Sequence, residues 1–437
     1  MQRALSFKAS PPLGAPLRFL VSAPLFALLA AMLMLWAGPV ALASRWNGYA
    51  LALTHLFTLG VLGNAMMGAM MQVMPVATGI SVLAPRVTAW LVHGLLSLGA
   101  LALAAGFLWV DPRFFGAAAP MLVACLLWFV VATAGALWRD RKRASKGSRE
   151  ILSAVRLALV SLLLTALLGG ALAGSMALAL PLPRQLTDLH GAWGLLGWVG
   201  LLIVGIAFQV IPMFQVTELY PKPITRWLTL TIFVLLLGHM ANALLPSAAQ
   251  WEAGFVLAVA LLACYLAFAA TSLQLLRHRK RPEPDTTTLF WRVSLGCLAA
   301  MLPVWLLHAA RVADFSVLLG VLFIAGFAWS AVNGMLYKIL PFLLWYHAQK
   351  DLTVALRVVP KVKEIIPDHI ARPQFRIHLG AITLLLLASV QPGLFTHAAA
   401  LALLVSTAWL CWTVLGALRL YTRARRDIAA ALAAMDG

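Results

Sequence analysis

Long apolar stretches, separated by short polar or basic segments, run through almost the whole chain. An α-helix needs about 20 apolar residues to cross roughly 30 Å of hydrocarbon. By that measure the pattern predicts twelve spans, which begin near residues 17, 49, 88, 114, 151, 188, 225, 252, 288, 316, 375 and 394. We expect one all-α membrane domain over 17–423, preceded by a cytoplasmic segment 1–16, interrupted by a cytoplasmic loop 349–375 and followed by a cytoplasmic tail 424–437.

A pattern of glycine, a polar residue and proline occurs three times within these stretches. The copies are Gly60-x2-Gly63-x4-Gly68-x3-Gln72-x2-Pro75, Gly197-x2-Gly200-x4-Gly205-x3-Gln209-x2-Pro212 and, less completely, Gly326-x7-Gly334-x3-Lys338-x2-Pro341. A repeat of this kind organises a fold. The spacing predicts three four-helix units, near 17–140, 150–277 and 288–423, around a pseudo-threefold axis.

Each residue type in the motif has a physical reason in a lipid environment. Small residues at a spacing near four let helices approach closely. Proline removes a backbone amide, and the carbonyl that loses its donor needs a partner nearby. Gln72, Gln209 and Lys338 are candidate partners, and we expect them to form a polar layer toward the cytoplasmic side. The alternative is a packing and kink device with no chemistry.

Composition and charge agree with this picture. Hydrophobic residues make up 62% of the chain and charged residues 11%, which is typical of a protein embedded in membrane lipid. The net charge of +19 comes from basic residues in alternate loops, at 139–156, 277–281, 350–376 and 419–426. The positive-inside rule then predicts that both termini are cytoplasmic in a bacterial inner membrane. Because the charge is explained by topology, nucleic-acid binding is not expected.

Histidines inside the spans are the candidate functional residues, because an ionisable group in a membrane is expensive. Five are expected near the periplasmic end of five different helices: His55, His190, His239, His308 and His397. Imidazole binds iron and copper, so at least two of these rings are expected to converge on a haem or a metal ion. Taken alone, each ring is better explained as a hydrogen-bonded core or interfacial residue.

A methionine run in the second span offers another reading. Met66, Met67, Met70, Met71 and Met74 form a thioether stripe, which suits either flexible core packing or copper(I). The four cysteines stand alone, without the C-x-x-C-H spacing of covalent haem attachment.

The span order resembles subunit I of the heme-copper oxidase superfamily, which includes terminal oxidases and nitric oxide reductases. The resemblance rests on His55 at the start of span two, on His190-Gly-Ala-Trp-Gly-Leu-Leu-Gly-Trp198 in span six and on Leu237-Gly-His239-Met in span seven. It implies that His55 is a ligand of a low-spin haem b, that His190 is a copper ligand and that His239 is one of the paired histidines of span seven.

Three departures from the family pattern limit what this resemblance implies. Span ten, Ala325 to Gly334, has no histidine; Gly238 stands where the family has a second histidine; and Gly194 stands where it has a tyrosine. All fourteen acidic residues lie in loops or at span ends, so proton pumping is not expected.

Two hypotheses follow. In the first, the protein holds b-type haem, with copper as a further candidate, through His55, His190, His239 and His308 (His190 and His239 for a metal). It would transfer electrons or handle a diatomic such as nitric oxide, with a cytochrome or copper-protein partner subunit. In the second, it is a cofactor-free relative that serves as a structural or assembly subunit, or as a carrier of copper or another small solute.

Overall fold

The computed structural model describes residues 10–142, 148–181, 184–243, 245, 247–349 and 359–436, and every regular element within them is a helix. Eleven helices in these ranges are long and apolar enough to cross a membrane by length and composition. The prediction of a multi-pass helical membrane protein is therefore confirmed. Parts of the predicted segment 1–16, of the basic loop 139–156 and of the loop 349–375 lie outside the described residues.

For description, the helices are divided into three consecutive groups at the boundaries of the predicted repeat units. The first group is α1 (Gly14–Ala37), α2 (Val40–Ala43), α3 (Gly48–His55), η2 (Leu56–Gly63), α4 (Asn64–Thr78), α5 (Pro85–Trp109) and α6 (Pro112–Arg139). The second is α7 (Arg149–Ala177), α8 (Arg184–Ala192), η3 (Trp193–Gly200), α9 (Leu201–Gln215), α10 (Lys222–Asn242) and α11 (Ser247–Arg277). The third is α12 (Thr286–Ala309), α13 (Ser316–Val321), η4 (Leu322–Trp329), α14 (Ser330–Ala348), α16 (Val362–Ile365), α17 (Asp368–Ala388) and α18 (Pro392–Asp436).

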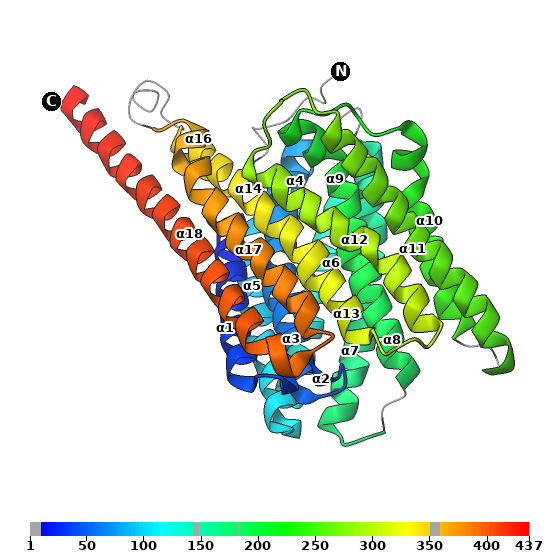
Figure 1. The fold of residues 1–437 in the computed structure, drawn as a ribbon. Helices are drawn as coiled ribbons and strands as arrows, with labels where there is room; N and C mark the ends of the chain where they lie inside the picture. Colours follow the sequence, from blue (N-terminus) through cyan, green and yellow to red (C-terminus); the bar gives the residue numbers. More distant parts are fainter. Residues whose placement is uncertain are drawn as a thin grey trace.

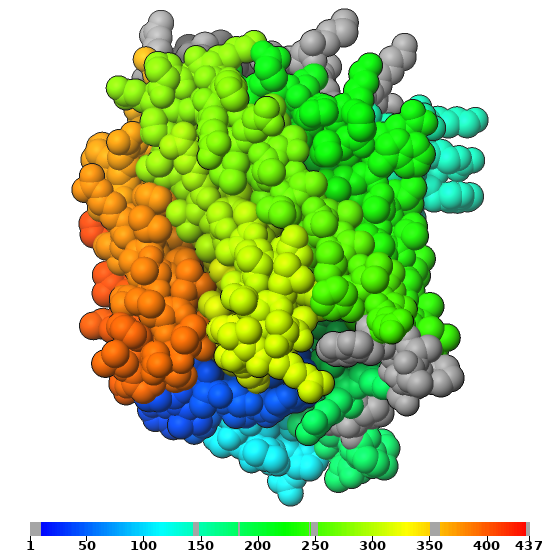
Figure 2. All heavy atoms as spheres, turned by 45° about the vertical axis from the view of Figure 1, so that its right-hand side comes forward, coloured from blue at the N-terminus to red at the C-terminus, as the bar shows by residue number. Residues whose placement is uncertain are grey.

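Helix α17 is the predicted span that is not among the eleven. Its first turns carry Arg372 and Arg376, which make it less apolar than the others. It nevertheless packs along α18 and contacts α12 and η4 (Figure 1). Figure 2 shows α17, α12, α13 and α11 on one face of the molecule, where α12 contacts the other three.

The second long helix of each group contains a π-helical segment of eight residues in the same register of the repeat. These segments are η2, η3 and η4, and in each the first motif glycine (Gly60, Gly197 or Gly326) is the fifth residue. Segments α3, α8 and α13 lie at one end of the bundle, and α4 and α9 lie toward the other end (Figure 1). The repeat is therefore carried by backbone conformation as well as by residue type.

Motif glycines mark where this second helix touches the first helix of its group. A Cβ added at Gly68 would lie 2.7 Å from the Phe19 side chain, and one at Gly334 would lie 2.5 Å from Phe290; Gly205 faces Ala154 in the same way. The earlier glycines touch the residue seven positions further along the first helix: Phe26 for Gly60, Ser161 for Gly197 and Cys297 for Gly326. The predicted packing role of these glycines is thus observed in all three groups.

A methyl group at one of these contacts should destabilise the fold. We expect Gly205→Ala to lower the free energy of unfolding by about 1–3 kcal/mol, since the added carbon overlaps Ala154. Thermal unfolding of the detergent-purified protein measures this. Gly296→Ala is the matched control, because an added Cβ there meets nothing within 4 Å. Equal melting temperatures for the two variants would contradict the packing role.

Candidate functional site

His55 and His190 face one another across two repeat groups. Their ring centroids are 6.3 Å apart and their planes differ by 16°. His55 is the last residue of α3, directly before η2, and His190 lies in α8, three residues before η3. Both rings are half-buried. The structure therefore brings together two of the histidines that the sequence nominates.

Each of the two rings is held through Nδ1. His55 Nδ1 lies 2.8 Å from the Leu51 carbonyl oxygen, and His190 Nδ1 lies 3.2 Å from that of Thr165. In the described part of the chain, these are the hydrogen bonds that the two rings make. A carbonyl at Nδ1 fixes the tautomer with the proton there and leaves Nε2 as the basic nitrogen, which is how metal-bound histidines are commonly oriented.

Neighbouring residues restrict how the rings can move. Phe107 of α5 stacks on His55 with centroids 5.1 Å apart. A Cβ added at Gly169 of α7 would lie 2.7 Å from His190 Cε1, so only glycine lets this helix pass so close to the ring. The pair is thus enclosed by α5 on one side and α7 on the other.

Charged side chains surround this end of the bundle. Arg45 pairs with Asp188 at 3.0 Å, and Arg45 and Arg184 both lie near the ring of Trp46, with their guanidinium carbons 4.4 and 5.7 Å from its centroid. Arg184 and Asp188 belong to α8, the helix that carries His190, and Arg45 precedes α3, which carries His55. Arg45 and Arg184 thus place positive charge at the end of the bundle that carries the histidines.

The remaining nominated histidines lie at the same end but have other partners. His239 interacts electrostatically with Asp188, and His308 Nδ1 accepts a hydrogen bond from the Phe315 amide and lies 3.7 Å from Asp314. A Cβ at Gly38 would lie 2.8 Å from His397, which is exposed. Among the described residues, no three His, Cys, Asp or Glu side chains are grouped so as to hold a metal ion.

No family model matches this chain, and no curated protein matches it.

Two further histidines occupy matching places in the first and third groups. His93 of α5 bonds Ser22 at 2.8 Å and packs edge-on against Phe19, while His378 of α17 bonds Ser330 at 2.8 Å and packs against Phe290. Phe19 and Phe290 are the residues that the motif glycines Gly68 and Gly334 touch. Their shared setting makes them packing and hydrogen-bonding residues.

Two of the three residues of the predicted polar layer bond outside their own helix. Gln72 donates to Ser10 Oγ at 3.2 Å, and Lys338 pairs with Asp285 at 2.7 Å. Gln209 also has a partner. For Gln72 and Lys338, the sequence predicts partners among the backbone groups freed by the prolines. The observed partners are different. The Gln72 bond ties α4 to the segment just before α1, and the Lys338 pair ties α14 to the N-cap residue of α12. The five methionines of α4 are all buried in the core.

Acid stability should depend on the Lys338–Asp285 pair. Burial raises the pKa of the Asp285 carboxyl, but Lys338 and hydrogen bonds from Thr288 outweigh it and hold this pKa below its usual range. A lowered pKa stabilises the fold above the unfolded-state pKa of about 3.9, and this stabilisation is lost as pH falls through the folded-state pKa. Lys338→Met removes the largest of the effects that lower the pKa of Asp285, so this pKa rises.

We therefore expect Lys338→Met to lower the melting temperature most at pH 7, with the deficit shrinking as pH falls below about 4. Thermal unfolding between pH 3 and 8 measures this. Lys280→Met is the control. Lys280 is 66% exposed and its partner Glu218 is 71% exposed, so loss of this ion pair should leave the melting temperature unchanged. A pH-independent deficit in Lys338→Met would argue against a charge effect.

Proposed function

We propose that this protein is an integral membrane haem protein in which His55 and His190 hold one b-type haem for electron transfer. The observation that carries the proposal is the 6.3 Å separation of the two ring centroids. A bond from an imidazole nitrogen to a metal is about 2.0 Å, so two rings this close could both reach one iron. His55 and His190 are the residues that would hold the group.

The surrounding residues support the same group. The carbonyls of Leu51 and Thr165 fix Nδ1 of the two rings and leave Nε2 for iron. Arg45 and Arg184 supply positive charge suited to the carboxylates of a haem. A copper centre with three protein ligands has no such support, since no group of three ligands is present among the described residues.

The ligand count favours one of the two roles expected from the sequence. A haem, when bound, would supply a one-electron couple. If both imidazoles held it, electron transfer would be favoured over binding of nitric oxide. The chain's own contribution is to orient the rings and to restrict water between α5 and α7. A cytochrome or copper-protein partner would exchange the electron.

The finer architecture belongs to the same proposal. We take α17 as the twelfth span, with three four-helix units around a pseudo-threefold axis and both termini on the cytoplasmic side of a bacterial inner membrane. The matched registers of η2, η3 and η4 support the axis. This arrangement agrees with the resemblance to heme-copper oxidase subunit I, although here the second ligand of the haem would come from span six.

The alternative is a cofactor-free relative that acts as a structural subunit or a solute carrier. Its supporting observation is that both rings already have a backbone hydrogen bond, which accounts for a half-buried histidine without a cofactor. Haem content separates the two functions.

We expect the protein, purified in detergent from cells supplied with haem, to show a Soret band and a reduced α-band. His55→Ala and His190→Ala should each lose these bands and the bound iron, while His278→Ala, in an exposed position outside the spans, should keep them. Adding free imidazole to His190→Ala should restore the bands, a result that a merely structural role would not give. A wild-type protein without haem would favour the cofactor-free function.

A further inference from the structure

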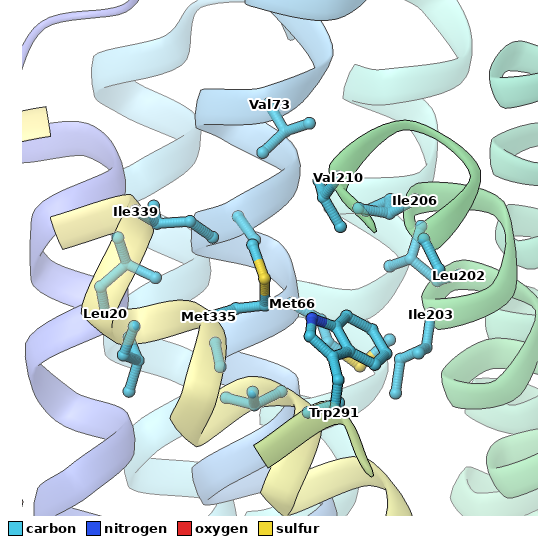
Figure 3. Close-up of a pocket in the computed structure, with 16 residues that line it drawn as sticks. Leu20, Met66, Val73, Leu202, Ile203, Ile206, Val210, Trp291, Met335 and Ile339 are labelled. Carbon is cyan, nitrogen blue, oxygen red and sulfur yellow. The ribbon is translucent and has the colours of Figure 1, made fainter. Parts of the chain in front are cut away.

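An apolar cavity lies where the three second helices meet. It has a volume of about 70 Å³ and is lined by residues of α4, α9 and α14, together with Leu20 of α1 and Trp291 of α12 (Figure 3). Its lining is distinct from the histidine pair, which precedes η2 and η3.

The lining comes from equivalent positions of the three motif copies. The four sets of equivalent residues are Ala65, Leu202 and Ala331; Met66, Ile203 and Val332; Ala69, Ile206 and Met335; and Val73, Val210 and Ile339. Because each set contributes all three of its members, the cavity lies on the line that relates the copies. It is a product of the repeat itself.

One polar group interrupts this apolar lining. The Trp291 indole is 2% exposed, and its buried Nε1–H has no hydrogen-bond partner among the residues that the structure describes. Figure 3 shows the indole projecting into the pocket, with its nitrogen on the side where Met66 and Met335 lie. A buried donor without an acceptor is unfavourable. A water needs two to four polar partners, so a site with a single donor does not suit water.

We infer that this cavity binds a small, uncharged and largely apolar molecule of two or three heavy atoms that carries one hydrogen-bond acceptor. Apolar cavities of about twice this volume take up xenon or benzene, so the space suits a ligand of gas size. The Trp291 N–H donates to the acceptor atom, and the aliphatic side chains contact the rest. This site does not depend on the histidine pair or on haem.

Binding can be followed with xenon and nitrous oxide as probes, on the full-length protein in detergent with 15N-labelled indole nitrogens. The Trp291 resonance is identified by its absence in Trp291→Phe. We expect both gases to shift this resonance saturably, and nitrous oxide, which has an acceptor atom, to shift it further downfield than xenon. The other tryptophan resonances report whether the fold is intact.

Filling the cavity should remove the response. Ala331→Leu places in the third copy the residue that the second copy has at Leu202, so the change is compatible with the repeat. We expect at least tenfold weaker xenon binding in this variant, measured by 129Xe exchange, and the same in Ala69→Leu. Ala124→Leu, on an exposed face of α6, should bind xenon as the wild type does. A wild-type Trp291 resonance that neither gas shifts, or unchanged binding in both filled variants, would overturn the inference.

Discussion

The close approach of two helices at the motif glycines is the contact on which the rest of the structure depends. In lipid, apolar side chains gain little by leaving the solvent, so helices associate through tight packing and hydrogen bonds. Gly60 and Gly68 bring the second helix against Phe26 and Phe19 of α1 at two levels, and the other two groups repeat this contact at the same spacing. With the first helices fixed, η4 contacts both η2 and η3, and the three second helices enclose the centre of the bundle.

Much of the fold follows from the sequence, because span length and glycine spacing are local properties. Ten of the eleven candidate spans begin within four residues of their predicted positions. The remaining span, predicted to begin near 252, begins at Glu252. The start of α17 was the least accurate: it begins at Asp368, whereas the predicted span begins near 375. Arg372 and Arg376 indicated a loop, yet arginines can lie in the first turns of a helix, where their long side chains reach polar surroundings.

The candidate site could be predicted only in part. The sequence nominates His55 and His190 because they are ionisable residues in apolar segments, but their contact depends on how far each helix is rotated about its own axis. The π-helical segment η2 begins one residue after His55 and η3 begins three residues after His190, and both change the rotational phase relative to the motif glycines. No residue spacing in either segment predicts a π-helix. The settings of His93 and His378 depend likewise on helix packing that periodicity does not specify.

The repeat also explains why the chemistry is asymmetric. Packing requires the three copies to be alike where helices touch, so glycine recurs at positions 68, 205 and 334. Nothing in that packing constrains the helix ends, and there the copies differ. The positions equivalent to His55 hold Ala192 and Val321, and those equivalent to His190 hold Leu53 and Leu319. The paired imidazoles therefore arise only between the first and second groups, while the third contributes Lys338 at the opposite end, in place of glutamine. The chain can thus carry one histidine pair because its three motif copies are alike at the glycines and differ where the helices leave the core.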